Sequence, residues 1–370
     1  MKTLLFRLSI WFSGSRIFLL IVAGLSLRFV PKGPFPAKTQ ALEWFNHWDA
    51  MWYLSIAQNG YSYDLHAPSN VNFFPLYPIL MHLLGWVVSD LRLAGYLLSN
   101  GLLFASCLLL WKLVIRDYGS RALADRSVLF LLLCPVTVFY SSIYTESLFL
   151  FLLLTVAYFA GEHRWLAAGG GGFLAALTRP PGILVTVLIA TEYGTRFLSG
   201  RETVRDGRRF AWAEAVRVLV ALVLPEIGLG LYALYLHARF GDSLAFVHSQ
   251  AHFNPRSYWF GNALSAGAGF RVHMIWFCGV MLIGFGLAAL GIVFRLRPSH
   301  LALTFALLFI YCSTNTPSPL PRYFSVVFPF YIIAAEICVR QPRLERWLFG
   351  ASAALAAFAV VLFVDGYGIS

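Results

Sequence analysis

Long apolar runs, separated by short basic or turn-forming segments, dominate this chain of 370 residues. An apolar run of about 20 residues predicts a helix that crosses a bilayer. We expect about eleven such helices, which makes the chain an all-α polytopic membrane protein, with residues 1–370 in a single transmembrane domain. The expected spans are 10–30, 92–115, 127–140, 146–160, 167–178, 181–196, 217–237, 270–294, 300–312, 323–339 and 347–364.

Composition supports the membrane class and excludes others. Hydrophobic residues make up 59% of the chain and charged residues 12%, against about 25% charged in soluble proteins. Disorder, a secreted disulfide scaffold and a coiled coil are therefore excluded as the main class. The net charge of +11 is attributed to Lys and Arg in cytoplasmic loops, so no nucleic-acid partner is expected.

One apolar segment is too short for a full span. Residues 74–89 carry Pro75 and Pro78 near their start, and this length suits an interfacial or re-entrant helix. If the segment stays at the surface, eighteen of the 28 Lys and Arg residues fall on the N-terminal side, nine on the other, and Arg16 within the first span. The positive-inside rule then predicts a cytoplasmic N-terminus. The predicted outer segments are the first outer loop 31–91, the loop 238–269, and the turns 141–145, 179–180 and 313–322.

The expected spans 127–140 and 167–178 are short, so we expect them to end beside an outer depression. The second contains Gly169–Gly172, which favours close helix packing over phosphate binding because no strand–turn–helix context surrounds it. The sequence shows no nucleotide-binding domain. Any transfer reaction must therefore draw its energy from a pre-activated substrate.

The first outer loop carries an aromatic helix with one acidic residue. Asn46 is the expected N-cap, and Asn59-Gly60 is the expected stop. Local pattern leaves two roles open for Asp49 in the first turn: a helix-capping acid, or a catalytic base facing a membrane-level cavity. His47 and Asp49 alone do not make a metal site, and neither a metal nor a cofactor is predicted.

Three further ionisable residues stand at the outer ends of spans: Glu146, Arg179 and Arg322. Charged groups at membrane depth are costly and usually face a cavity or each other. The planar guanidinium forks of two arginines would suit a phosphate. The alternative is that the arginines are ordinary anchors whose charged ends reach the interface.

At these positions the sequence resembles the PIG-V family, that of the second GPI mannosyltransferase and its prokaryotic relatives. The likeness extends from position 10 to about 340, and where the family commonly has Arg before Trp-Asp, this chain has His47. The motifs that carry it are the runs His47–Tyr53, Ile56–Tyr61 and Asn72–Pro78, which contain the Trp48-Asp49 pair, an Ala-x-x-Gly-Tyr segment and a Phe-Phe-Pro-x-x-Pro segment. Weaker matches lie at Tyr144–Ser147, Thr178–Pro180 and Pro321–Tyr323.

The resemblance implies a GT-C glycosyltransferase with two interfacial helices in its first outer loop. The implied donor is a polyprenyl or dolichyl phosphate sugar, most simply mannose, which is transferred with inversion to a glycan or glycolipid acceptor. A prokaryotic relative would act among the lipids of the plasma membrane, at its outer face.

The resemblance also gives roles to individual residues. Asp49 is the expected base, Arg322 and Arg179 are expected to hold the donor phosphate, and Glu146 is a secondary acid. The remaining expected substrate contacts, which shape the site, are His47, Trp48, Tyr61 and Tyr77.

Two alternative functions remain open. A transporter or flippase for lipid-linked sugars would use the same cavity and arginines without a catalytic carboxylate, and it often shows paired inverted halves. Another GT-C enzyme, such as a protein O-mannosyltransferase or an O-antigen ligase-like protein, is the second. The Trp-Asp and Phe-Phe-Pro motifs favour the PIG-V likeness over both.

Overall fold

The computed structural model describes residues 2–34, 43–199, 207–253, 268–313 and 319–367. Every regular element within these ranges is a helix, which confirms the predicted all-α class. Parts of four predicted loops, at 35–42, 200–206, 254–267 and 314–318, lie outside the described residues.

Within these ranges, five helices are long and apolar enough to cross a membrane, judged by length and composition. They are α1 (Lys2–Phe29), α4 (Leu91–Tyr118), α10 (Gly207–Phe240), α13 (Ala268–Val293) and α17 (Pro342–Val364). The shorter helices that fall on predicted spans are α5 (Arg121–Leu132), α7 (Glu146–Gly161), α8 (Trp165–Ala176), α9 (Val185–Leu198), α14 (Pro298–Cys312) and α16 (Pro329–Arg340). Each predicted span thus contains a helix, while the number that cross the bilayer stays a prediction.

The span predicted at 127–140 is displaced in the structure. α5 begins six residues earlier, because the Ser120 hydroxyl caps it by accepting a hydrogen bond from Leu123 N at 3.2 Å. The helix ends at Leu132, shortly before Pro135, which cannot continue it. A separate short helix, α6 (Val138–Ser141), follows.

The helix predicted after Asn46 begins later than expected. α2 (Asp49–Asn59) has Trp48 at its N-cap position, with a positive φ of 47° and no side-chain cap. Asn46 is therefore not the N-cap. The predicted stop is confirmed, because Gly60 follows α2 with φ 79°, a conformation that glycine adopts without strain.

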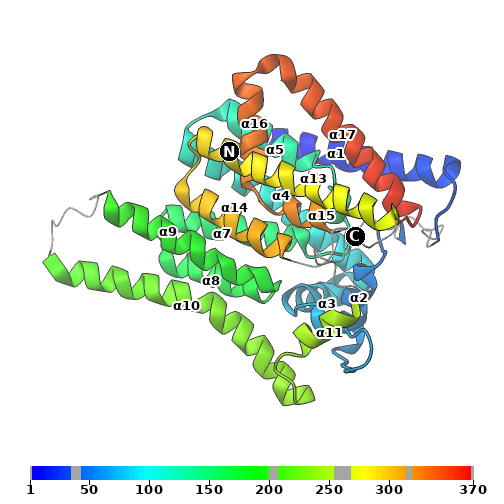
Figure 1. Ribbon diagram of the computed structural model, residues 1–370, viewed down its shortest axis with the longest axis horizontal. Coiled ribbons are helices and arrows are strands. Elements are labelled where there is room, and N and C mark those ends of the chain that lie inside the picture. Colours follow the sequence, from blue (N-terminus) through cyan, green and yellow to red (C-terminus); the bar gives the residue numbers. More distant parts are fainter. Residues whose placement is uncertain (1, 35–42, 200–206, 254–267, 314–318, 368–370) are drawn as a thin grey trace.

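The segment 74–89 forms α3 (Leu76–Val88), whose 13 residues rise about 20 Å, less than the roughly 30 Å of a hydrocarbon core. Its first residue donates from Leu76 N to Leu177 O at 3.0 Å, beyond the end of α8. Beyond its last turn, Arg92 of α4 pairs with Glu43 of the first outer loop at 3.1 Å. The start of α3 therefore contacts the outer end of the predicted span 167–178, and α2, α3 and α11 (Ala245–Phe253) gather at one end of the bundle (Figure 1).

The glycine run packs two helices closely together. A Cβ atom on Gly169 of α8 would lie 2.6 Å from Cα of Ala221 in α10, and one on Gly172 would lie 2.7 Å from Cγ of Pro225. Only glycine allows this approach. The predicted role of the run in helix packing is confirmed.

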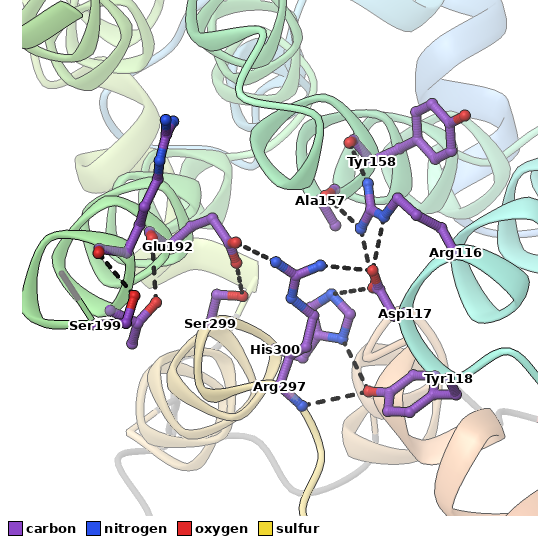
Figure 2. Close-up of polar contacts among 12 residues, drawn as sticks. Arg116, Asp117, Tyr118, Ala157, Tyr158, Glu192, Ser199, Arg297, Ser299 and His300 are labelled. Carbon is purple, nitrogen blue, oxygen red and sulfur yellow. Dashed lines mark hydrogen bonds and ion pairs between the residues drawn. The ribbon is translucent and has the colours of Figure 1, made fainter. Parts of the chain in front are cut away.

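A buried ion network joins the end of α4, α9 and the start of α14 (Figure 2). Asp117, whose side chain is fully buried, accepts hydrogen bonds from Arg116 Nε at 2.6 Å and from Arg297 Nη1 at 2.5 Å. Arg297 also pairs with Glu192, which accepts a hydrogen bond from Ser299 Oγ at 2.6 Å. The network ties α4, α9 and α14 together through paired charges.

Other basic segments predicted to share the cytoplasmic side also meet. Arg126 of α5 pairs with Glu345 of α17 at 2.8 Å. Glu214 of α10 accepts hydrogen bonds from Trp165 Nε1 at 2.9 Å and from Arg196 Nη1 at 2.7 Å. These contacts join segments that the basic-residue count assigns to the cytoplasmic side, an assignment that stays a prediction.

Candidate active site

Arg322 brings two distant carboxylates together. It lies in the short helix α15 (Leu320–Ser325), and its side chain is 5% exposed. Its Nη1 donates a hydrogen bond to Asp49 Oδ2 at 2.5 Å, and its Nε donates to Glu146 Oε1. A residue near the end of the chain thus joins the first outer loop to the start of α7.

Glu146 holds a second arginine. Its side chain is fully buried, and Oε1 also accepts a hydrogen bond from Arg179 Nη2 at 2.8 Å. Buried charges are tolerated when they are paired. Asp49, Glu146, Arg179 and Arg322, all predicted site residues, therefore form one charged quartet with two carboxylates and two guanidinium groups.

The charged quartet retains unused hydrogen-bonding capacity. Glu146 Oε2 and Arg179 Nη1 are buried, and neither has a hydrogen-bond partner within the described residues. The Asp49 side chain remains 28% exposed. Arg179 therefore has a donor, and Asp49 an exposed part of its carboxylate, that the quartet itself does not use.

The quartet borders a cavity of about 610 Å³. Asp49, Arg179 and Arg322 line this cavity, and Glu146 lies behind them. Further lining comes from the first outer loop, from η3 (Pro180–Leu184), which follows α8, and from α11, α14 and α15. The neutral side chains of the wall include Tyr53, Asn72, Phe73, Phe74, Thr178, Phe246, Gln250, Phe253, Tyr311 and Tyr323. Segments predicted to face outward thus converge here, and Thr178 and Arg179 just beyond α8 form part of the predicted depression.

Two of the other predicted site residues pack against the C-terminal helix. The rings of His47 and Trp48 lie 5.5 Å and 4.9 Å from that of Phe363 in α17. His47 O also accepts a hydrogen bond from Tyr144 OH at 2.9 Å, and burial lowers the pKa of the His47 imidazole. These contacts fix the chain just before Asp49.

The positive φ of Trp48 completes this support. A bulky residue in the left-handed region is strained and persists only where surrounding contacts hold it. Here the strained residue directly precedes Asp49, at the first position of α2. The turn at Trp48 therefore helps to place the carboxylate beside Arg322.

Tyr61 and Tyr77 hold the first outer loop in place. Tyr61 OH donates a hydrogen bond to Phe73 O at 2.6 Å, and the fully buried Tyr77 OH lies 2.7 Å from Ser99 Oγ. These two tyrosines, like His47 and Trp48, are not among the described residues that line the cavity. All four shape the site through protein contacts.

Sequence reasoning gave no site role to several polar residues of the cavity wall, among them Tyr53, Asn72 and Gln250. Tyr53 follows Asp49 by four positions, so helical spacing alone places it on the same face of α2. Asn72 immediately precedes the Phe-Phe-Pro segment, and this neighbourhood could have drawn attention to it. Gln250 of α11 stands among several histidines in the sequence, but this cluster has no defining spacing. Within the described ranges, no group of three or more His, Cys, Asp or Glu side chains could hold a metal ion.

Comparison with known proteins matches the first outer loop and the helices that follow it. The model of the mannosyltransferase (PIG-V) family matches residues 36–166. GPI mannosyltransferase 2 of Drosophila melanogaster is 27% identical over 206 residues, which cover 52% of this chain and 44% of that protein. The same enzyme of Drosophila pseudoobscura pseudoobscura is 30% identical over 133 residues, covering 32% of this chain and 28% of that protein. The matched regions thus span less than half the length of these relatives.

A solved structure resembles nearly the whole chain. ArnT from Cupriavidus metallidurans, in a crystal structure bound to undecaprenyl phosphate, superposes with a TM-score of 0.51 and 14% identity, covering 96% of this chain and 76% of ArnT. At this identity the likeness shows the fold, which is that of GT-C enzymes. Residues 36–166 are therefore similar to the PIG-V mannosyltransferases, and the chain has the fold of the GT-C enzymes, as the sequence predicted.

Proposed function

We propose that the protein is a membrane glycosyltransferase. It transfers a sugar, most simply mannose, from a polyprenyl or dolichyl phosphate donor to a glycan or glycolipid acceptor at the outer face. The observation that carries this proposal is the charged quartet at the cavity, where a partly exposed carboxylate and an arginine with an unused donor meet. The likeness of residues 36–166 to mannosyltransferases supports mannose as the sugar.

The phosphate of the donor is assigned to the arginine side of the cavity. Arg179 Nη1 is a buried donor without a hydrogen-bond partner in the described part of the chain, and a phosphate oxygen would satisfy it. The undecaprenyl phosphate bound to ArnT supports a lipid phosphate as the ligand class. The cavity wall is otherwise rich in aromatic side chains, which suits the sugar and the first part of the lipid.

In the proposed reaction, the carboxylate of Asp49 acts on the acceptor and the guanidinium groups of the quartet act on the donor phosphate. The acceptor hydroxyl attacks C1 of the sugar and gives its proton to Asp49, while the bond between C1 and the phosphate oxygen breaks. The electron pair of that bond leaves with the phosphate. Fixed guanidinium groups stabilise the charge that develops there, and attack from the face opposite to the leaving group inverts C1.

Arg322 and Glu146 position these groups. Arg322 donates to Asp49 Oδ2 and so fixes the orientation of the base. Glu146 contacts both arginines from a fully buried position, behind the cavity wall. We therefore assign Glu146 to holding the arginines, in place of the secondary-acid role expected from the sequence.

The proposal is tested with purified protein and a panel of polyprenyl phosphate sugars. Undecaprenyl phosphate mannose is expected to lose its sugar to an acceptor or to water, with undecaprenyl phosphate as the lipid product detected by mass spectrometry. The glucose-carrying lipid tests the choice of sugar. Movement of intact lipid-linked sugar across a vesicle membrane, with no cleavage of any donor, would instead establish a flippase.

A further inference from the structure

Asn72 lies on the wall of the same cavity. It ends η2 (Asn70–Asn72), a single 3₁₀ turn of the first outer loop, and lines the cavity together with Asp49 and Arg179. Its amide atoms Oδ1 and Nδ2 are both buried, and neither has a hydrogen-bond partner among the residues that the structure describes. Buried amides in folded proteins are nearly always hydrogen-bonded, so an open amide at a cavity wall points to a ligand.

Asn70, two positions earlier, shows how an asparagine serves the fold in the same turn. Its Oδ1 accepts a hydrogen bond from Ser62 N at 2.8 Å, and its Nδ2 donates to Gly60 O at 3.1 Å. Asn70 is 2% exposed, and its amide holds the segment that follows α2. Within the described residues, the fold therefore uses the amide of Asn70 and leaves that of Asn72 open.

The chemistry of this amide matches a sugar better than a phosphate. An asparagine amide offers a carbonyl acceptor and an NH2 donor, and each hydroxyl of a sugar can both donate and accept. A fully ionised phosphate offers acceptors only and would leave Oδ1 unsatisfied. Phe73 and Phe74 line the cavity beside Asn72, and ligand sites commonly combine such aromatic walls with a few polar groups that fix orientation.

We propose that Asn72 binds two neighbouring hydroxyl groups of a sugar and contributes to the choice of that sugar. This assignment rests on the proposed function, in which a sugar occupies the cavity beside Asp49. The hydroxyl groups belong either to the donor sugar or to an acceptor sugar, because both carry the same chemistry. The two arms of the following experiment separate these sources.

The donor arm compares the full-length parent protein with Asn72→Leu, and with Asn72→Ala as a second variant in case leucine does not fit. The probes are undecaprenyl phosphate mannose and undecaprenyl phosphate alone. If Asn72 binds the donor sugar, each variant weakens binding of the mannosylated lipid about tenfold, as the loss of one or two neutral hydrogen bonds predicts. Binding of undecaprenyl phosphate itself should not change.

The acceptor arm uses methyl α-mannoside as the acceptor probe and measures its KM. If Asn72 binds the acceptor sugar, this KM rises about tenfold, while both donor affinities stay at the parent values. Thermal stability provides the structural comparison. We expect Asn72→Leu to melt at the parent temperature or above it, and Asn70→Leu to melt lower because its amide is used by the fold.

Two results would overturn the assignment. In the first, the parent protein transfers sugar, but the Asn72 variants keep the parent affinity for undecaprenyl phosphate mannose and the parent KM for methyl α-mannoside. The other is a loss of stability in Asn72→Leu as large as that in Asn70→Leu, which would show that the fold itself uses the amide. A parent protein that cleaves no polyprenyl phosphate sugar contradicts the proposed function first, and the sugar-binding role of Asn72 with it.

Discussion

Arg322 and Asp49 are joined by a single hydrogen bond of 2.5 Å, from Nη1 to Oδ2, across 273 positions of the chain. The same guanidinium is held at its Nε by the fully buried Glu146. The direction of the Asp49 carboxylate is therefore set from the C-terminal part of the chain as well as by its own helix. This arrangement favours the catalytic role of Asp49 over the capping role, because the described contact of its carboxylate is with an arginine side chain.

Replacing Asp49 by asparagine should abolish most turnover with little loss of stability. Asn keeps the size and an oxygen that can accept the hydrogen bond from Arg322, but it cannot take a proton from the acceptor. A general base contributes roughly 100- to 10,000-fold, so turnover with undecaprenyl phosphate mannose should fall by at least about 100-fold. Donor affinity should remain, because Arg179 is unchanged.

Asp64→Asn is the matched control for this change. Asp64 is an exposed carboxylate of the same first outer loop, and its Oδ1 accepts a hydrogen bond from the backbone at His66 N. Its replacement should leave turnover at the parent rate. Near-parent turnover in Asp49→Asn, with a lowered melting temperature, would establish Asp49 as a structural acid.

The two arginines of the quartet should not tolerate lysine. Lysine keeps the charge but replaces a planar fork with a single ammonium, which cannot span Asp49 and Glu146 as Arg322 does. Arg322→Lys should lower turnover, and Arg179→Lys should weaken binding of undecaprenyl phosphate, each by about tenfold or more. Arg92→Lys, at a half-exposed surface pair, is the control. Full activity and donor affinity in both quartet variants would place the phosphate elsewhere.

The sequence predicts features that depend on neighbouring residues better than features that depend on contacts between distant parts of the chain. Helix positions follow local apolar runs, so α4 and α17 lie close to their predicted ranges, and α1 ends where predicted although it begins eight residues earlier. The turn at Gly60 follows from glycine itself. The start of α2 was predicted wrongly, because a polar side chain at Asn46 suggested a cap, whereas packing of Trp48 on α17 determines the first turn.

Local sequence patterns do not predict contacts between residues that are far apart in the chain. The sequence marked Glu146 and Arg179 as charged groups at span ends, but their hydrogen bond depends on how α7 and α8 pack. The roles of Tyr61 and Tyr77 in holding the loop depend in the same way on partners elsewhere. The open amide of Asn72 becomes visible only when its neighbours are in place.

Two buried carboxylates that each hold two arginines should behave differently when neutralised. Glu146→Gln and Asp117→Asn both leave buried guanidinium groups undercompensated, and removing one partner of a buried pair costs about 3–5 kcal/mol. Both variants should therefore lower the melting temperature. Only Glu146→Gln should also raise the Kd for undecaprenyl phosphate, because Asp117 belongs to the separate network of Figure 2.

The control for these two variants is Glu336→Gln in the half-exposed pair with Arg340, where a loss of at most about 1 kcal/mol is expected. Equal effects of Glu146→Gln and Asp117→Asn on lipid binding, at matched residual stability, would contradict a specific role for Glu146.

The last prediction concerns the path of the chain across the membrane. α3 has 13 residues, and its first residue contacts Leu177 at the outer end of the predicted span 167–178. Just beyond its end, Arg92 pairs with Glu43 of the predicted first outer loop. A reporter that is active only outside the cytoplasm should therefore be active when fused after Asp90, at the start of α4. The same reporter fused after Gly119, at the far end of α4, should be inactive, and a cytoplasmic reporter should give the opposite pair of signals. Activity of the cytoplasmic reporter after Asp90 would mean that 74–89 crosses the bilayer, and it would move the later loops to the opposite sides.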